Sequence, residues 1–452
     1  MAKEDIRKGD RRKRRANGRS ALRRDSAKTR RQRAGEPDTG TQGYGLAFHV
    51  IIFLIAFLIV FSRRTDALLH AQFWAEDGKN WYHDAYQFGL HSLLMPQDGY
   101  LQTLSRLIAL LALLFPFHAA PLAMNLCAIT VQVLPVNVFL SSRYSNLGMA
   151  TRAAASFLYL AVPNSYEIHA NVTNIQWHLA LLACLLLLAR PAGGWGWRIF
   201  DAIVLVLVSL DSATVFVLAP LAVGLWWKRR RTWPGMSFLP LVPGAVIQAS
   251  SVLLSQSRPH GPDGASFARL LSILGRQVFL GSLVGMRTII TLVDDYSAHA
   301  LFCAEVIAAV AGIAILLYAL RYSPTELRLF ILFAFAVFAL CLLWPEVARP
   351  NERQWESLIP PGEGNRYFFL PMLGFLAALV WMAADRAVPR RMRYLAGAVL
   401  LLLPIGIYQD WYYPAFRNLH FPRYAAQFER APSGTQFTIP INPDWTMQLT
   451  KR

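Results

Sequence analysis

The chain has 452 residues, of which 55% are hydrophobic and 16% are charged, and its mean hydropathy is +0.33. A soluble globular domain carries about 25% charged residues. The shortage of charge, spread over many long apolar runs, excludes an ordinary soluble enzyme and predicts a polytopic membrane protein.

The net charge of +18 is concentrated near the N-terminus. Residues 1–36 contain fifteen Lys or Arg against five Asp or Glu. This tail has too few apolar residues to bury a core, so we predict that residues 1–43 are disordered. The positive-inside rule places the tail in the cytoplasm, where anionic membrane lipids attract it, and this explanation of the charge is favoured over nucleic-acid binding.

Eleven apolar runs are candidates for membrane-spanning helices, because about 20 apolar residues cross the hydrocarbon core. The first run begins near Tyr44, and we interpret it as an uncleaved anchor. The eleven runs are 44–62, 121–141, 151–163, 177–190, 199–210, 213–227, 237–256, 300–319, 327–344, 367–384 and 394–409. A further run, 103–115, is short, and we expect a helix that lies at the outer interface.

Basic clusters between the runs indicate the orientation. The clusters are Arg143 with Arg152, Arg190 with Arg198, Lys228–Arg231, Arg321 with Arg328, and Arg386–Arg393. All of them face the cytoplasm if the eleven runs cross and 103–115 does not. We therefore predict an all-α protein of the cytoplasmic (inner) membrane, with a transmembrane domain at 44–409, a cytoplasmic N-terminus and an extracytoplasmic C-terminus. Short re-entrant helices are the alternative to some of the spans.

On this topology the long connections lie at the outer face. They are the loops 63–120, 164–176, 257–299 and 345–366, and the C-terminal segment 410–452, in which Thr435–Ile441 is predicted to form a strand. A polar surface on one side of the membrane favours chemistry at the outer membrane–water boundary over passage through the midplane.

An adjacent acidic pair, Glu76 and Asp77, comes soon after the first apolar run. The following residues read as an interfacial helix, because aromatic rings are enriched at headgroup depth. The aromatic residues concerned are Trp74, Trp81, Tyr82 and Tyr86. The turn Pro96–Tyr100 then returns the chain toward the bilayer. A solvated acidic turn with an aromatic anchor is the simpler interpretation, but the position of the pair favours a functional one.

A second polar stretch connects the third and fourth runs and would lie on the same side as the acidic pair. Its candidate substrate-binding residues are Glu167, His169, Asn171, Asn174, Gln176, Trp177 and His178. Amides and carboxylates beside an aromatic ring suit sugar binding, and polar groups at membrane depth are costly unless they line a cavity. A hydrated loop that caps two helices is the alternative.

Three arginines in the later outer loops are candidates for binding phosphate, because a guanidinium grips two oxygens at once. Arg366, followed by Tyr367, ends the loop 345–366, and its alternative role is an interfacial anchor. Arg276 and Arg287 lie in the loop 257–299, where we expect one or two interfacial helices. Asp211 stands between two apolar runs, and we favour a cap of the following helix over a place in the site.

The first outer loop also carries a resemblance. The string Trp74–Gly78, with Gly99–Gln102 and Ser105–Leu107 after it, resembles the GT-C glycosyltransferases and a group of uncharacterised bacterial membrane proteins of that type. Protein O-mannosyltransferases and lipid A aminoarabinose transferases belong to this class. The resemblance implies a membrane enzyme that takes a sugar from a polyprenyl phosphate or diphosphate carrier, and it is specific only over about residues 73–107.

We therefore predict transfer of a sugar to an acceptor in the cell envelope, which is a glycan, a lipid or a protein. Such a transfer needs a base for the acceptor hydroxyl, and Asp77 is slightly favoured over Glu76 for that role. The other carboxylate is then its partner, or a ligand of a divalent cation such as Mg²⁺ or Mn²⁺. A transporter or flippase of lipid-linked glycans is the alternative, although it should show charges within its spans.

Overall fold

The computed structural model describes residues 44–191, 193–228, 238–255, 261–347, 352–362 and 364–452. The fold below is that of the unit Leu46–Arg452. The predicted tail 1–43, and residues 229–231 of one basic cluster, lie outside the described residues.

All eleven predicted apolar runs form helices, and six of them are long and apolar enough to cross a membrane. These six are α2 (Leu46–Arg63), α6 (Ala120–Leu140, after η3, Phe117–Ala119), α14 (Ala298–Tyr322), α15 (Thr325–Leu343), α17 (Asn365–Ala384) and the pair α18 (Arg390–Leu400) and α19 (Leu403–Gln409). The all-α membrane fold is thus confirmed.

The other five runs form shorter helices of 13 to 17 residues. They are α7 (Met149–Ala161), α8 (Ile175–Leu188), α9 (Trp195–Ser209), α10 (Val215–Lys228) and α11 (Phe238–Leu254). At about 1.5 Å per residue, such helices are shorter than the hydrocarbon core. The number of spans is therefore not settled at eleven.

A seventh segment of membrane-crossing length, Phe267–Asp295, lies within the predicted outer loop 257–299. It consists of α12 (Phe267–Ser272), the π-helix η6 (Ile273–Leu280) and α13 (Gly281–Asp295), with non-helical backbone at Gly285. Its contacts follow in order along the chain: Arg269 pairs with Glu356, residues 276–277 bond to the carbonyls of 358–360, and residues 286–287 bond to Asp410 and Tyr412. These contacts tie residues 269–287 to the predicted outer loop 345–366 and to the C-terminal segment, while η6 packs along α14.

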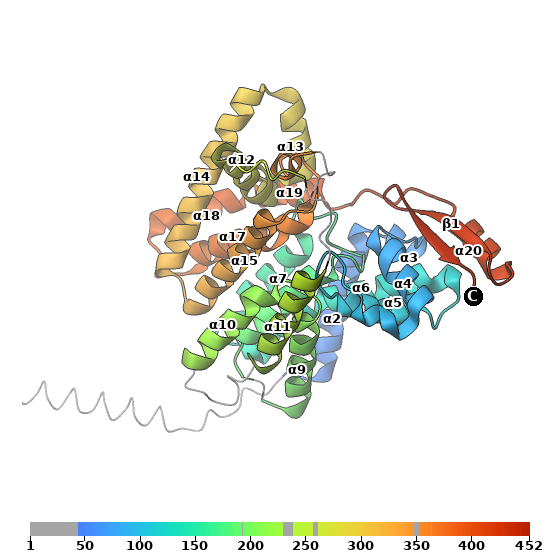
Figure 1. The fold of residues 1–452 in the computed structure, drawn as a ribbon. Helices are drawn as coiled ribbons and strands as arrows, with labels where there is room; N and C mark the ends of the chain where they lie inside the picture. The colour runs from blue at the N-terminus through green and yellow to red at the C-terminus, as the bar shows by residue number, and fades with distance from the viewer. Residues whose placement is uncertain (1–43, 192, 229–237, 256–260, 348–351, 363) are drawn as a thin grey trace, which may run out of the picture. The chain divides into compact units, whose positions relative to one another are not determined.

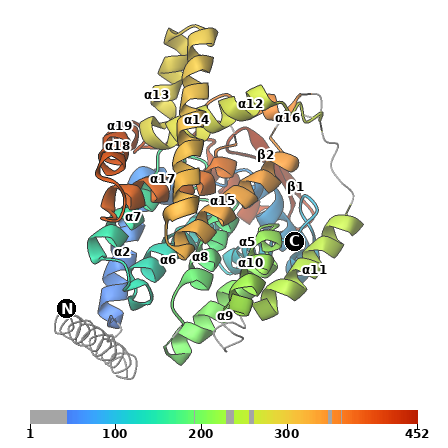
Figure 2. The ribbon, with the colours of Figure 1, turned by 90° about the vertical axis from the view of Figure 1, so that its left-hand side faces the viewer.

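Basic residues predicted to face the cytoplasm gather at one end of the bundle. Arg143, in η4 (Ser142–Tyr144), donates to both carboxylate oxygens of Asp201 at 2.7 and 2.9 Å, and its Nε donates to the carbonyl of Arg190. Figure 2 shows the helices between the two ends and the projecting pair α13 and α14. At the other end, contacts such as those of Asp77 with Val172 and of Glu167 with Arg366 join loops that are distant in the chain.

The first outer loop folds into short helices that pack with the C-terminal segment (Figure 1). The loop contains α3 (Asp66–Leu69), the π-helix η1 (Asp77–Tyr82), α4 (His83–Phe88), η2 (Gly89–Leu94) and α5 (Thr103–Ala112). The C-terminal segment contains α20 (Phe421–Arg430) and an antiparallel hairpin of β1 (Gln436–Ile441) and β2 (Trp445–Thr450), which confirms the predicted strand at Thr435–Ile441 within one residue.

An aromatic core joins these two parts. Phe73 and Phe117 each lie 5.3 Å from Phe421, centroid to centroid, and Tyr82 lies 5.0 Å from Phe73. Trp81 and Tyr82 are 1% and 2% exposed, so their rings pack inside the protein and not against lipid. Their rings are covered by residues that are distant in the sequence, which hydropathy along the first loop does not reveal.

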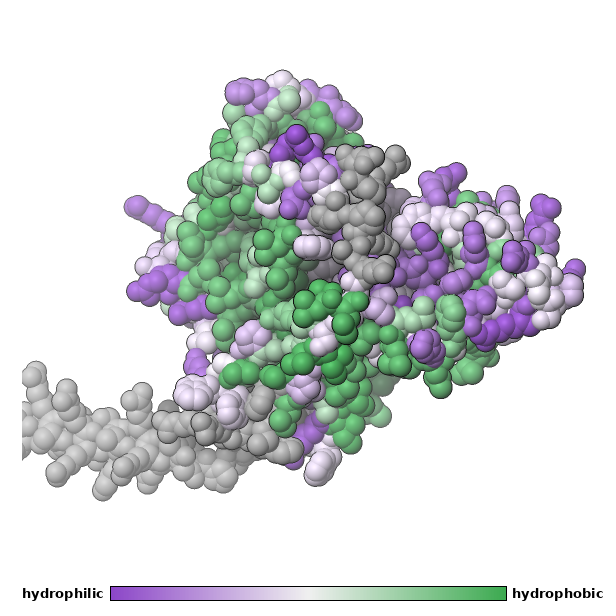
Figure 3. Space-filling view, in the orientation of Figure 1, coloured by the Kyte–Doolittle hydropathy of each residue, from purple (hydrophilic) through white to green (hydrophobic). Residues whose placement is uncertain are grey.

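The helix expected at the outer interface has one apolar buried face and one apolar exposed face. α5 buries Leu104 and Ile108 and exposes Leu107 and Leu111. Figure 3 shows apolar side chains over much of the helical bundle and polar ones gathered over the C-terminal segment. Asp211 accepts a 2.6 Å hydrogen bond from the amide of Leu104, so it caps α5 and not the helix that follows it.

Candidate active site

Asp77, the first residue of η1, is 1% exposed and binds the loop that follows α7. One carboxylate oxygen accepts from the amide and the hydroxyl of Thr173, each at 2.7 Å, and the other accepts from the amide of Val172 at 3.0 Å. Burial raises the pKa of Asp77 to about 7, although these three donors favour the charged form. Both oxygens are thus engaged by protein groups.

Glu76 is half-buried and lies among charged groups from three other segments. Burial raises the pKa of this carboxyl, and the positive charge of Arg366 opposes the rise. The negative charges of Glu167 and Asp98 add to it. A half-buried carboxylate with a raised pKa, close to other charges, is typical of catalytic acids and bases.

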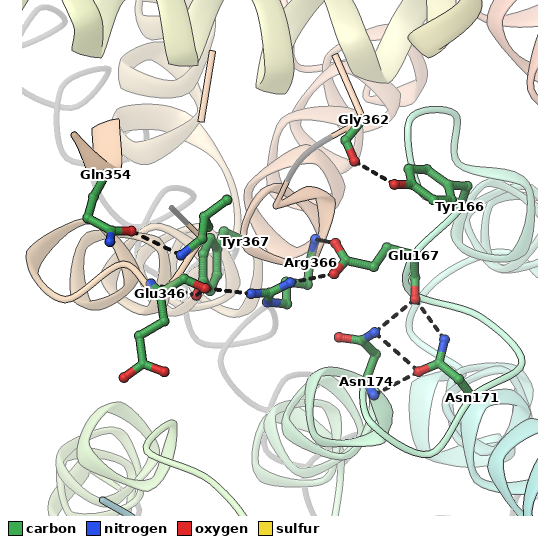
Figure 4. Close-up of polar contacts among 10 residues, drawn as sticks. Tyr166, Glu167, Asn171, Asn174, Glu346, Gln354, Gly362, Arg366 and Tyr367 are labelled. Atoms are coloured by element: carbon green, nitrogen blue, oxygen red, sulfur yellow. Dashed lines mark hydrogen bonds and ion pairs between the residues drawn. The ribbon is translucent and has the colours of Figure 1, made fainter. Parts of the chain in front are cut away.

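Arg366, at the start of α17, lies between two outer loops (Figure 4). Its guanidinium forms an ion pair with Glu167 and donates to the carbonyl of Glu346 at 2.8 Å. It also lies 4.8 Å from the ring centroid of Tyr367. These contacts hold the arginine at one end of the bundle. Its charge and that of Glu167 both act on Glu76, so three of the predicted site residues belong to one group.

The turn 97–100 contributes two residues that sequence reasoning did not select. Gln97 and Tyr100 exchange two backbone hydrogen bonds, and Asp98 and Gly99 between them have positive φ angles of 54° and 91°. Besides burial, the negative charge of Asp98 raises the pKa of Glu76, and Tyr100 bonds to Gln176. The turn motif was visible in the sequence, but nothing there indicated which helices it faces.

Most of the polar residues of the second outer loop hold that loop together. Asn171 and Asn174 donate to the carbonyl of Glu167 at 2.8 and 2.9 Å (Figure 4). His169 and His178 are fully buried, and they bond to Tyr413 at 2.8 Å and to Tyr159 at 2.6 Å. We therefore interpret these four residues as a scaffold that places the Glu167 side chain.

The remaining candidates lie to the sides of this group. Trp177 is 6% exposed and packs edge-on against Tyr367, with 5.9 Å between centroids. Arg276 forms an ion pair with Glu305, and Arg287 donates to the carbonyl of Tyr412 at 2.9 Å. These arginines bind protein groups at the same end of the bundle as Arg366.

The acids do not form a site for a resident metal. Among the described residues, no group of three or more His, Cys, Asp or Glu side chains is arranged to hold an ion. Asp77 in particular gives both of its oxygens to the loop at 172–173. Glu76 and Asp77 therefore do not fit the role of paired metal ligands in this structure.

An apolar groove lies between α14 and α15, closed on one side by α12 and η6. Its volume is about 520 Å³, and its lining is formed almost entirely by Leu, Ile and Phe side chains. The groove ends at Leu342, Leu343 and Trp355, and Trp355 donates to the carbonyl of Leu342 at 3.0 Å. Glu346, which binds Arg366, follows Leu343 by three residues in the chain.

Comparison with known proteins adds a distant likeness. No family model and no curated protein matches the sequence. Among solved structures, the chain is similar to the oligosaccharyltransferase of Archaeoglobus fulgidus, crystallised with Zn and sulfate, with 14% identity and a TM-score of 0.43. The match covers 85% of this chain, which spans 56% of that protein's length. A similarity at this identity and TM-score is too low to indicate a function.

Proposed function

We propose that the protein transfers a sugar from a polyprenyl-phosphate or diphosphate carrier to an envelope acceptor at the outer face of the cytoplasmic membrane. The observation that carries the proposal is the half-buried carboxyl of Glu76, whose pKa burial raises and the positive charge of Arg366 lowers, at the end of the bundle where Arg366 binds Glu346, three residues beyond the apolar groove in the chain. The carboxylate suits proton removal, the guanidinium suits a phosphate, and the groove suits an isoprenoid chain.

In the proposed reaction, Glu76 takes the proton from the acceptor hydroxyl as its oxygen attacks the anomeric carbon of the donor. The bond between that carbon and the phosphate oxygen breaks, and the phosphate leaves with the electron pair, close to Arg366. The sugar is expected to invert its configuration in this single displacement. Asp77 then has the supporting role, because its oxygens bind Thr173 and Val172. We therefore assign the base to Glu76 and the supporting role to Asp77, which is the reverse of the assignment slightly favoured from the sequence.

No step of this mechanism passes through a metal, because the described acids do not fit a resident ion. Activity in the presence of a chelator tests this point directly. Loss of transfer in EDTA, restored by Mg²⁺ or Mn²⁺, would show that a cation enters with the substrate phosphate.

The test of the function is transfer by the purified protein. It is incubated with radiolabelled polyprenyl-phosphate mannose, glucose or arabinose and with an envelope extract that supplies acceptors. Label in the extract, dependent on the intact protein, supports the proposal. Movement of labelled lipid between the leaflets of a liposome, without cleavage of the sugar–phosphate bond, would instead identify a flippase.

A further inference from the structure

The C-terminal segment contacts the first outer loop immediately before and after the acidic pair. The carbonyl of Asn442 accepts from the amide of Ala75 at 2.6 Å, and the amide of Asn442 donates to the carbonyl of Phe73 at 3.2 Å. Beyond the pair, a Cβ added at Gly78 would lie 3.1 Å from Cδ1 of Ile441. Ile441 and Asn442 therefore bracket Glu76 and Asp77 on both sides.

The residue before Glu76 has an unfavourable backbone conformation. Ala75 has a φ of 42°, in the left-handed region that residues with a side chain seldom adopt, and such a conformation is unfavourable. It persists only where the surroundings hold it. The amide of this same residue donates to Asn442, and the backbone at this point sets the direction in which the Glu76 side chain leaves the chain.

Asn442 is itself held rigidly. It is 2% exposed, and its side chain accepts from the amide of Arg417 at 2.8 Å and donates to the carbonyl of Arg417 at 3.1 Å. The segment that contains Arg417 is in turn bound to Gln72 at 3.0 Å. Asn442 thus connects the stretch around Arg417 to Phe73 and Ala75, the residues that lead into the acidic pair.

The two carboxylates differ in how they are held. Asp77 has its own side-chain partners in Thr173 and Val172. The place of Glu76 depends instead on the conformation of Ala75. A disturbance at Asn442 should therefore change Glu76 more than it changes Asp77.

We propose that Asn442 is a positioning residue for Glu76, so that the C-terminal segment forms part of the active site. The inference rests on the proposed function, in which Glu76 is the base. It goes beyond that function because it assigns a catalytic requirement to a segment that contributes no group to the reaction. A displacement of about 1 Å at a base can cost about a hundredfold in rate.

The experiment compares Asn442→Ala with a matched control in the full-length protein. The alanine keeps the backbone groups that bond to Phe73 and Ala75, but removes the two side-chain bonds to Arg417 that hold this backbone in place. The control, Gln87→Ala, removes a 3.2 Å bond to the carbonyl of Thr450, which also ties the C-terminal segment to the first outer loop. Asn442→Ala is expected to lower kcat by about tenfold to a hundredfold, with little change in the KM for the lipid-linked donor. Gln87→Ala is expected to leave both constants unchanged, at a similar melting temperature.

A second readout does not depend on knowing the sugar. Carbodiimides label protonated carboxyl groups, so the pH midpoint of labelling at Glu76, measured by mass spectrometry, reports its surroundings. Asn442→Ala is expected to move this midpoint at Glu76 and to leave that of Asp77 in place. If Asn442→Ala does not fold, Ile441→Val, which removes the methyl group facing Gly78, is measured in the same way and should move the midpoint at Glu76 while that of Asp77 stays in place.

The two proposals can fail separately. An unchanged kcat and an unchanged labelling midpoint in the Asn442 variant would overturn the positioning role, even if Glu76→Gln is inactive. Full activity of Glu76→Gln would overturn the role of Glu76 as base, while the labelling experiment would still report whether Asn442 places that carboxyl.

Discussion

Thr173 donates two hydrogen bonds to a single carboxylate oxygen of Asp77, one from its amide and one from its hydroxyl, and both are 2.7 Å long. The two residues are 96 positions apart, so this contact docks the second outer loop onto the first. A buried carboxylate with three donors is a structural anchor whose loss is expected to loosen the loop that carries Glu167.

The first prediction concerns this anchor. Thr173→Val removes the hydroxyl bond and keeps the amide bond, and a hydrogen bond to a charged group contributes about 1.5–3 kcal/mol. We expect a lower melting temperature with most of the kcat retained. Thr291→Val is the control, because that hydroxyl makes an exposed 3.2 Å bond to a carbonyl of its own helix. An unchanged melting temperature for Thr173→Val would contradict the assignment.

The second prediction separates the two acids. Glu76→Gln keeps the size of the side chain and removes the base, so we expect kcat to fall by about 10²–10⁴-fold with the fold intact. Asp77→Asn is expected to lower stability first, because an amide nitrogen cannot accept from the loop at 172–173. Measurement of kcat and of the melting temperature for both variants tests which carboxylate is the base. A loss of kcat at normal stability in Asp77→Asn, with an active Glu76→Gln, would assign the base to Asp77.

The third prediction is a pH dependence. The base must be ionised to act, and burial raises the pKa of Glu76 despite the charge of Arg366. The value of kcat/KM should therefore fall as the pH drops through this raised pKa, above the range of an ordinary glutamate. Asp98→Asn removes a nearby negative charge and is expected to move this acidic limb to lower pH. A limb that stays in place in that variant would assign it to another group.

The fourth prediction tests the arginine. Lysine cannot hold Glu167 and the carbonyl of Glu346 together while it also faces a phosphate. Arg366→Lys is expected to raise the donor KM by about tenfold or more and to lower kcat. Arg353→Lys, which changes an exposed ion pair with Glu356, is the control and should have near-normal kinetics. Equal effects of the two substitutions would argue against phosphate binding at Arg366.

The fifth prediction tests the groove. Ala339 lines it from α15, so Ala339→Trp fills part of its volume of about 520 Å³. The KM for a donor with a long isoprenoid chain should rise, while that for a donor with a chain of two or three isoprene units should not. Val246→Trp places the same side chain on an exposed part of α11 outside the groove lining. An equal response of long and short donors would mean that the chain binds elsewhere.

Sequence reasoning succeeded where the signal is local. Hydropathy located the eleven apolar runs as helices but left the membrane-length segment Phe267–Asp295 in a loop, and charge grouped Arg143 with Arg190, which are in contact. It failed where partners are distant: the donors that bind Asp77 come from residues 172 and 173, and the group near Glu76 includes Asp98 from a turn that reads only as a turn. It also did not foresee that Trp81 is buried, because a ring covered by other residues and a ring that faces lipid look alike in the sequence.

The contact between Asn442 and Ala75 also has a consequence for biosynthesis. The acidic pair emerges from the ribosome with the first helix, whereas Asn442 is translated only after every helix of the membrane bundle. A nascent chain paused in the translocon therefore exposes Glu76 without the partner that orients it. On the proposed function, such a chain becomes able to transfer sugar only after its C-terminal segment has folded onto the first outer loop.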